Sequence, residues 1–200
     1  MNRWNERYAG EDFLFGTTPN AFLRAQRHHL PARGSALAVA DGEGRNGVWL
    51  AAQGLDVLAV DASDVGLAKS RRLAADRGVT LAWELADLAR WDFGRERFDV
   101  IAAIFIQFAY PALRAHIFAG MKAALKPGGV LLLEGYRPEQ LDYRTGGPSE
   151  LDHLYTEPML REAFGDLQIE HLASYDAELD EGAGHRGMSA LIDLVARKPG

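Results

Sequence analysis

Short apolar runs alternate with amphipathic stretches along most of the chain. Runs rich in small and β-branched residues are typical of strands buried on both faces of a sheet, and five occur, at 35–40, 56–61, 79–85, 98–105 and 130–136. Helical patterns separate several of these runs, over 46–53, 63–77 and 112–125. This rhythm predicts an α/β fold, a doubly wound and mostly parallel sheet with helices on both faces.

The last part of the chain breaks this rhythm. Two strand-like runs, 167–175 and 188–198, have no helical pattern between them, so we expect a terminal antiparallel hairpin with a loose linker over 176–187. Two other segments lie outside the sheet pattern, and both are expected near the carboxyl ends of the strands, where ligands bind in such sheets. We interpret residues 1–30 as an N-terminal cap, 137–165 as a substrate lid, and 1–200 as a single domain.

Composition narrows the function classes. The chain has 22 Lys and Arg against 28 Asp and Glu, a net charge of −6, which argues against a nucleic-acid partner. It has no cysteine, and its six histidines have no ligand spacing, so we expect neither a metal nor a thiol nucleophile. The polar amino terminus does not resemble a signal peptide, and the longest apolar stretch is too short to cross a bilayer. We therefore expect a cytoplasmic protein with no membrane partner, either a monomer or a homodimer.

A glycine-rich turn, Asp-Gly-Glu-Gly-Arg-Asn-Gly, follows the first predicted strand. Gly42 and Gly44 would let the backbone approach a ligand closely, with N–H groups of the next helix facing it. Asp61 ends the second predicted strand, where a carboxylate accepts the hydroxyl protons of a ribose. Together these features predict a ligand that contains adenosine. The alternative is a structural turn that the nearby acid merely caps.

Both NAD and S-adenosylmethionine fit that prediction, and three features favour S-adenosylmethionine. No Tyr-x-x-x-Lys pair occurs, the terminal hairpin is foreign to plain dinucleotide folds, and Asp87 follows the third strand, where an adenine amino group would lie. The sequence leaves two alternatives open: a short NAD(P)-dependent oxidoreductase, and a non-catalytic module that binds S-adenosylmethionine.

At this point the chain resembles the class I S-adenosylmethionine-dependent methyltransferases, and within them the branch of tellurite-resistance and thiopurine-type methyltransferases. The resemblance covers nearly the whole chain and rests on the motifs WNERY, FGTTPNAFL, GEGRN, VDAS, ADL, LKPGG, EGY, TGGP and EGAGHRG. It implies a seven-stranded sheet of order 3-2-1-4-5-7-6 with the last strand antiparallel. It also implies methyl transfer to a small-molecule nucleophile, with family analogy favouring a thiol or a chalcogen oxyanion.

The resemblance also implies roles for individual residues. Gly42 and Gly44 would approach the methionine part of the cofactor, and Asp61 would hold its ribose. The other residues expected to contact the cofactor are Tyr8, Asp41, Ala62, Asp87, Leu88 and Phe105. One departure from the family pattern stands out: the chain has Ala38 and Ala40 where an acid and a glycine are usual. Asp41 is the local substitute that we expect for the missing acid.

Two residues of the EGAGHRG segment are the candidates for catalysis. His185 lies in a glycine-rich loop expected at the ligand end of the sheet, and Arg186 beside it could hold an anionic substrate. Methyl transfer is an in-line displacement in which alignment does most of the work, and a base is needed only for an acceptor that arrives protonated. A solvated hairpin loop is the equally weighted alternative.

Overall fold

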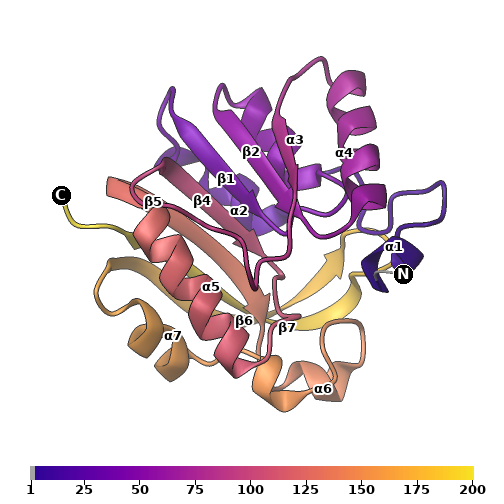
Figure 1. Cartoon of the computed structure of the whole chain (residues 1–200). Coiled ribbons are helices and arrows are strands. Elements are labelled where there is room, and N and C mark those ends of the chain that lie inside the picture. Colours follow the sequence, from indigo (N-terminus) through magenta and orange to yellow (C-terminus); the bar gives the residue numbers. More distant parts are fainter. Residues whose placement is uncertain (1–2) are drawn as a thin grey trace.

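A computed structural model describes residues 3–200. Its seven strands form one sheet of order β3-β2-β1-β4-β5-β7-β6 (Figure 1), which confirms the expected order. The strands are β1 (Ser35–Val39), β2 (Asp56–Asp61), β3 (Ala82–Leu85), β4 (Phe98–Ile104), β5 (Leu125–Tyr136), β6 (Gln168–Asp180) and β7 (Arg186–Arg197). The first five pair in parallel, and β7 runs antiparallel to both β5 and β6.

Helices cover both faces of the sheet (Figure 1). The helical elements are α1 (Arg3–Arg7), α2 (Ala21–Ala25), η1 (Gln26–His29), α3 (Arg45–Ala52), α4 (Asp64–Asp76), α5 (Pro111–Ala124), α6 (Gln140–Tyr143), η2 (Leu151–His153) and α7 (Glu157–Phe164). Apolar residues of α5 and α7 pack into the core on one face, and those of α2, α3 and α4 pack on the other. This two-sided cover explains the apolar sequence of β1, in which Leu37 and Val39 face one core cluster while Ala36 and Ala38 face the other.

Local signals set the bounds of α4 as the sequence predicts. The hydroxyl of Ser63 accepts a hydrogen bond from the Gly66 N–H at 3.0 Å, which caps the helix start. Gly78 follows the helix with φ +66°, and the Val79 N–H donates to Ala74 O at 3.0 Å. Because Val79 closes the helix through this bond, β3 begins at Ala82, three residues later than the start of the predicted strand 79–85.

The terminal hairpin is longer than expected. The predicted linker 176–187 is wrong, because β6 continues to Asp180 and β7 already begins at Arg186. The reason is an alternation of polar and apolar residues in which Ala177 and Leu179 both pack against one small core cluster. The LKPGG turn is likewise part of the sheet: Leu125 pairs with Phe98 before the register shifts.

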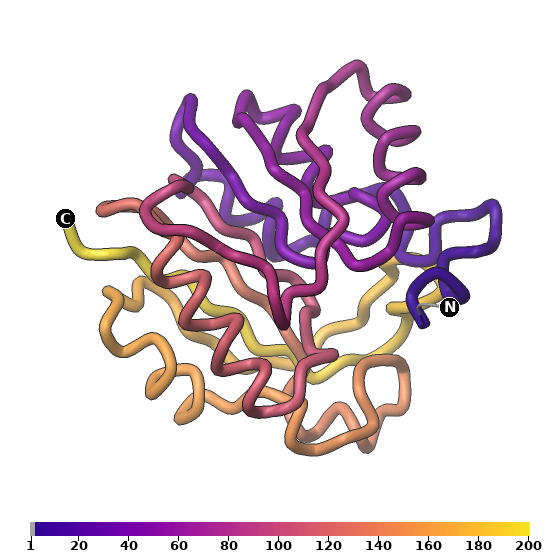
Figure 2. The backbone as a smooth tube through the Cα atoms, viewed as in Figure 1, coloured from indigo at the N-terminus to yellow at the C-terminus, as the bar shows by residue number. Residues whose placement is uncertain are grey.

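The segment expected as a cap lies partly at the carboxyl ends of the strands. Residues 1 and 2 lie outside the described residues. From α1 the chain passes beside α4 and the loop of the β6–β7 hairpin (Figure 2), and α2 then packs on a face of the sheet. Of the segment expected as a lid, residues 146 and 147 lie against Tyr136 at the end of β5, whereas α7 covers the sheet beside α5.

Candidate functional site

The acid at the end of β2 holds the turn that follows β1. Asp61 Oδ2 accepts from the Gly42 N–H and Oδ1 from the Ser63 N–H, both at 2.8 Å. The Asp61 side chain is buried, and this burial raises the pKa of its carboxyl above the ordinary value. The Ala62 N–H is a third backbone donor to this carboxylate. The two oxygens carry four lone pairs in all, so one remains for a ligand hydroxyl.

Tyr8 covers this turn. Gly42 has φ +56°, and a Cβ at this position would lie 2.5 Å from the Tyr8 hydroxyl oxygen. Burial and then the nearby Asp61 carboxylate raise the pKa of Tyr8, which therefore stays a neutral hydroxyl. Tyr8, which the sequence predicts to contact the cofactor, thus lies directly against the glycine turn.

Gly44 serves a different contact. It has φ +93°, and a Cβ here would lie 2.1 Å from Ser70 Oγ on α4. Its small size therefore lets the turn pack against α4. Its expected approach to the methionine part of the cofactor stays a prediction.

Replacing Gly44 with alanine is expected to destabilise the fold more than the same change at Gly78. Both glycines have positive φ, but a Cβ at Gly78 meets nothing within 4 Å. The difference between Gly44→Ala and Gly78→Ala therefore isolates the contact with Ser70, and overpacking of this kind costs about 1–3 kcal/mol. Denaturant unfolding of both variants measures it. Equal losses of unfolding free energy in the two variants would show that the positive φ alone accounts for the cost of substituting Gly44.

Asp41 caps the start of α3. Its two carboxylate oxygens lie 3.0 and 3.2 Å from the Gly47 N–H, which donates to them. Burial, the largest cause, raises the pKa of Asp41 to about 7. The expectation that N–H groups at this helix start face a ligand is therefore wrong for Gly47, because a side chain of the turn already occupies it.

An open edge adjoins Asp61 on the side of β3. Ala62 and Asp87 are exposed, and Leu85 is 59% exposed, while Leu88 is buried in the core. Asp87 Oδ1 accepts from the Ala89 N–H at 3.0 Å, which fixes its carboxylate at this edge. The edge combines apolar side chains with an acid, the combination that an adenine ring and its amino group require.

Four rings form an aromatic cluster at the carboxyl ends of β4 and β5: Phe15, Phe105, Tyr136 and His185. The His185 ring lies 4.4 Å from both Phe15 and Phe105, and Phe105 stacks on Tyr136 at 4.6 Å. Phe105 has φ +55°, a conformation that non-glycine residues rarely adopt, and this marks a strained position at the strand end. Phe15 also contacts Tyr8 at 6.3 Å, so the aromatic cluster continues to the glycine turn.

The two residues expected for catalysis lie in different surroundings. His185 is 8% exposed, and burial, followed by the charges of Arg45 and Arg7, lowers its pKa to about 3. Its imidazole is therefore neutral at physiological pH. Arg186 is exposed and pairs with Asp180 across the hairpin at 2.9 Å, which leaves its guanidinium outside the aromatic cluster.

The polar side chains of the glycine turn hold the front segment in place. Glu43 Oε2 accepts from the Leu14 N–H at 2.8 Å, and Glu43 Oε1 pairs with Lys69 Nζ at 2.7 Å. Lys69 Nζ also donates to the carbonyl of Asp12 at 2.7 Å. Sequence reasoning missed this role, because it depends on contacts between residues far apart in the chain.

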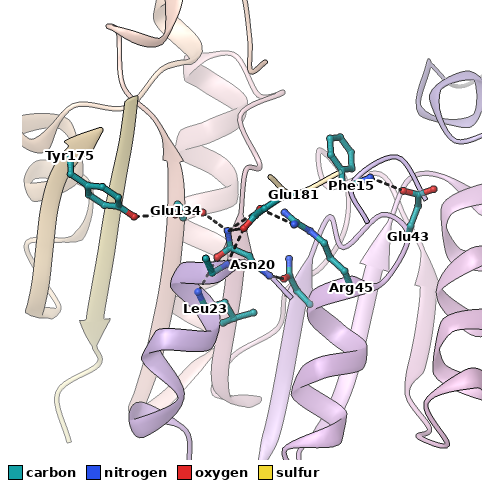
Figure 3. Close-up of polar contacts among 10 residues, drawn as sticks. Phe15, Asn20, Leu23, Glu43, Arg45, Glu134, Tyr175 and Glu181 are labelled. Atoms are coloured by element: carbon teal, nitrogen blue, oxygen red, sulfur yellow. Dashed lines mark hydrogen bonds and ion pairs between the residues drawn. The ribbon is translucent and has the colours of Figure 1, made fainter. Parts of the chain in front are cut away.

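Asn20 joins the glycine turn to β5 and the hairpin loop (Figure 3). Its N–H donates to Asn46 Oδ1 at 3.0 Å, and its Nδ2 donates to Glu134 Oε2 at 2.5 Å and to Glu181 Oε1 at 3.2 Å. Arg45 Nη1 lies 2.7 Å from Glu181 Oε2. The turn is thereby tied to the loop that carries His185.

A buried pair of carboxyls lies beside Asn20. Glu134 and Asp193 face each other across β5 and β7 and are 1% and 4% exposed. Burial is the main cause that raises both pKa values, well above the ordinary value for Glu134 and to about 6 for Asp193. In such a site the charge on either carboxylate disfavours ionisation of the other.

Comparison with known proteins matches the middle of the chain to a family model. Residues 36–129 match the methyltransferase domain family. The matched region contains the glycine turn, Asp61 and Asp87. S-adenosylmethionine is the cofactor that this match supports. No curated protein matches the chain in sequence.

Solved structures share the fold over almost the whole chain. TehB from Haemophilus influenzae superposes with a TM-score of 0.74 at 20% identity, over 98% of this chain and 65% of that one. The N-methyltransferase NodS from Bradyrhizobium japonicum WM9 gives 0.69 at 14% identity, over 100% and 98%. A protein from work on the conversion of a disulfide bond into a thioacetal group during echinomycin biosynthesis gives 0.77 at 16%, over 98% and 88%. At these identities the likeness establishes the Rossmann-like methyltransferase fold.

The residues at the turn fit this cofactor. Asp61 keeps a lone pair for a ribose hydroxyl, and the exposed Ala62, Leu85 and Asp87 suit the adenine ring. Among residues 3–200 no group of three or more potential metal ligands comes together. No helix in that same range is long and apolar enough to span a membrane.

Proposed function

We propose that this chain is an S-adenosylmethionine-dependent methyltransferase that acts on a small-molecule nucleophile, with a thiol or a chalcogen oxyanion as the favoured acceptor. The observation that carries the proposal is the position of Asp61, whose carboxylate holds the glycine turn and borders the exposed edge at Ala62 and Asp87. The match of residues 36–129 to the methyltransferase domain supports the same reaction.

The proposed site divides into two parts. Tyr8, Gly42, Asp61 and the edge at Asp87 would bind the cofactor, and the aromatic cluster would receive the acceptor. When bound, S-adenosylmethionine supplies an activated methyl group. The cluster consists of packed aromatic rings, so it would exclude bulk water and align the acceptor, and alignment alone can lower a barrier by roughly 7–11 kcal/mol.

The low pKa of His185 favours acceptors that need no base. An imidazole with a pKa of about 3 accepts protons poorly at neutral pH. A thiolate or an oxyanion already carries its lone pair without proton transfer, whereas an aliphatic amine would first have to lose a proton. This supports the soft or anionic nucleophiles that the family analogy favours.

Calorimetric titration with S-adenosylhomocysteine and, separately, with NADH tests the cofactor. We expect binding of the former alone. Tight binding of NADH without a response to S-adenosylhomocysteine would support an oxidoreductase instead. A panel of thiols, phenols, amines and oxyanions then tests turnover, and silence across the panel with the cofactor still bound would favour a sensor module.

The variant His185→Ala is expected to lose turnover while it keeps its affinity for S-adenosylhomocysteine. The imidazole lies in the aromatic cluster, against Phe105 and Phe15, and not at the glycine turn. Initial rates and calorimetry measure the two effects. The exposed His116 on α5 provides the control His116→Ala, which should match the wild type in both. If His185→Ala turned over at the wild-type rate, His185 would have no role in methyl transfer.

A further inference from the structure

Several buried polar side-chain atoms have no hydrogen-bond partner among residues 3–200, and they include the Tyr136 hydroxyl oxygen, His185 Nδ1 and Arg45 Nη1. Arg45 Nη1 nevertheless has an ion-pair partner, because Glu181 Oε2 lies 2.7 Å away. Tyr136 is 1% exposed and His185 is 8% exposed, so solvent does not satisfy these atoms.

Two of these atoms belong to one compact group. The Tyr136 and His185 rings are 5.7 Å apart, with Phe105 in contact with both. The backbone of Gly146 closes over them: a Cβ on Gly146 would lie 3.6 Å from the Tyr136 hydroxyl oxygen and 3.9 Å from His185 Cδ2. Burial, followed by the charges of Glu134 and Glu181, raises the pKa of Tyr136, and the charge of Arg45 opposes this shift. Burial and then the same Arg45 charge lower the pKa of His185.

The backbone of Tyr136 is fixed so that its hydroxyl stays in this position. The Tyr136 N–H donates to Gln107 Oε1 at 2.6 Å, and its carbonyl accepts from Gln107 Nε2 at 2.9 Å. A Cβ on Gly147 would lie 2.7 Å from the Tyr136 ring, so the lid rests directly on it. A ring held on both sides gives its hydroxyl a defined direction, as a binding group requires.

The chemistry of the unpaired atoms indicates what they lack. A tyrosine hydroxyl and an arginine N–H are donors, and a neutral imidazole carries a donor on one of its nitrogens. A buried donor without an acceptor costs about 1–3 kcal/mol, and such groups in native proteins need an explanation. An atom with lone pairs would satisfy the Tyr136 hydroxyl as a donor, and a negatively charged one would accept most strongly.

We propose that the Tyr136 hydroxyl donates a hydrogen bond to the nucleophilic atom of the methyl acceptor and aims this atom at the methyl group, with His185 beside it as a neutral partner. The inference rests on the proposed function and adds an acceptor-binding residue to it. The acceptor arrives with its lone pair already free. That pair forms the new bond to the methyl carbon, while the bond from this carbon to the sulfonium sulfur breaks and its electrons neutralise the sulfur. No proton moves in this step.

Tyr155 provides a matched control. It is 1% exposed and its hydroxyl also has no partner within the described residues. Its ring, however, packs with Phe118 of α5, in a core cluster that contains neither Tyr136 nor His185. The substitutions Tyr136→Phe and Tyr155→Phe therefore remove the same atom from equally buried rings, one inside the aromatic cluster and one outside it.

The experiment compares the wild type with these two variants, using thiophenol and selenite as probes. Calorimetry first measures the affinity for S-adenosylhomocysteine, which we expect to be unchanged within about twofold in both variants. Titration of each probe into the protein loaded with S-adenosylhomocysteine, and kcat/KM for methyl transfer, then report on the acceptor. We expect Tyr136→Phe to lower binding and kcat/KM for at least one probe by about 10- to 100-fold, the range for a lost hydrogen bond to a charged group, and Tyr155→Phe to match the wild type.

A spectroscopic readout separates binding from a merely structural effect. Thiolate absorbance should show that thiophenol is bound in its ionised form by the wild type, with a smaller ionised fraction in Tyr136→Phe. Equal behaviour of Tyr136→Phe and Tyr155→Phe would overturn the inference. The inference would also be overturned if the wild type, loaded with S-adenosylhomocysteine, bound neither thiophenol nor selenite. Failure to bind S-adenosylhomocysteine at all would instead refute the proposed function.

Discussion

Removal of the Asp61 carboxylate is expected to weaken cofactor binding and to destabilise the protein at the same time. Asp61→Ala would lose the charged hydrogen bond to the ribose, about 1–3 kcal/mol of binding free energy. It would also leave the Gly42 and Ser63 N–H groups without their acceptor, at a further cost of about 1–3 kcal/mol each in unfolding free energy. Calorimetry with S-adenosylhomocysteine and denaturant unfolding measure the two losses.

Two further variants make this result specific. Asp61→Asn keeps one acceptor oxygen and should fold even if the alanine variant does not. Asp56→Ala changes an exposed acid at the other end of β2 and should leave both quantities unchanged. Normal affinity in Asp61→Asn and Asp61→Ala would show that the ribose is held elsewhere.

Glu43→Ala is expected to destabilise the protein by about 3–5 kcal/mol, because it leaves the buried Lys69 ammonium without a countercharge, with the Asp12 carbonyl as its remaining hydrogen-bond partner. It would also free the Leu14 N–H and loosen the front segment. Denaturant unfolding measures the first effect. Faster chymotryptic cleavage at Phe13 and Phe15 would report the second.

The control for Glu43 is a surface ion pair. Asp166 pairs with Lys122 at 2.9 Å but is 63% exposed, so Asp166→Ala should change stability by less than about 1 kcal/mol. The double variant Glu43→Gln with Lys69→Met should recover part of the loss, since no unpaired charge remains. A loss for Glu43→Ala no larger than that for Asp166→Ala would show that the ion pair does not hold the front segment.

The sequence predicts the elements whose signals are local. Ser63 and Gly78 mark the two ends of α4 through capping and positive φ, which act within a few residues. The extended length of the hairpin was missed, although Ala177 and Leu179 alternate with acidic residues in the way a half-buried strand requires. The acidic composition of that stretch hid the alternation.

The site is less predictable because its parts come from distant segments. Asp61 is a candidate from the sequence because it ends a strand next to a glycine turn. The position of Tyr136 depends on Gln107 and on Gly146 and Gly147, and the partner of Glu43 depends on the path of residues 12–15. The spacing of residues in a single sequence does not reveal contacts between such distant segments.

The raised pKa values of Glu134 and Asp193 affect how the whole molecule moves in an electric field. The formal net charge of −6 counts every acidic side chain as ionised. Burial raises the pKa of Glu134, Asp193 and Asp41, so the folded protein binds more protons near neutral pH than this count assumes, and its charge is less negative. The folded protein should therefore migrate more slowly toward the anode than its residue count implies, and unfolding should restore the ordinary pKa values and remove the discrepancy.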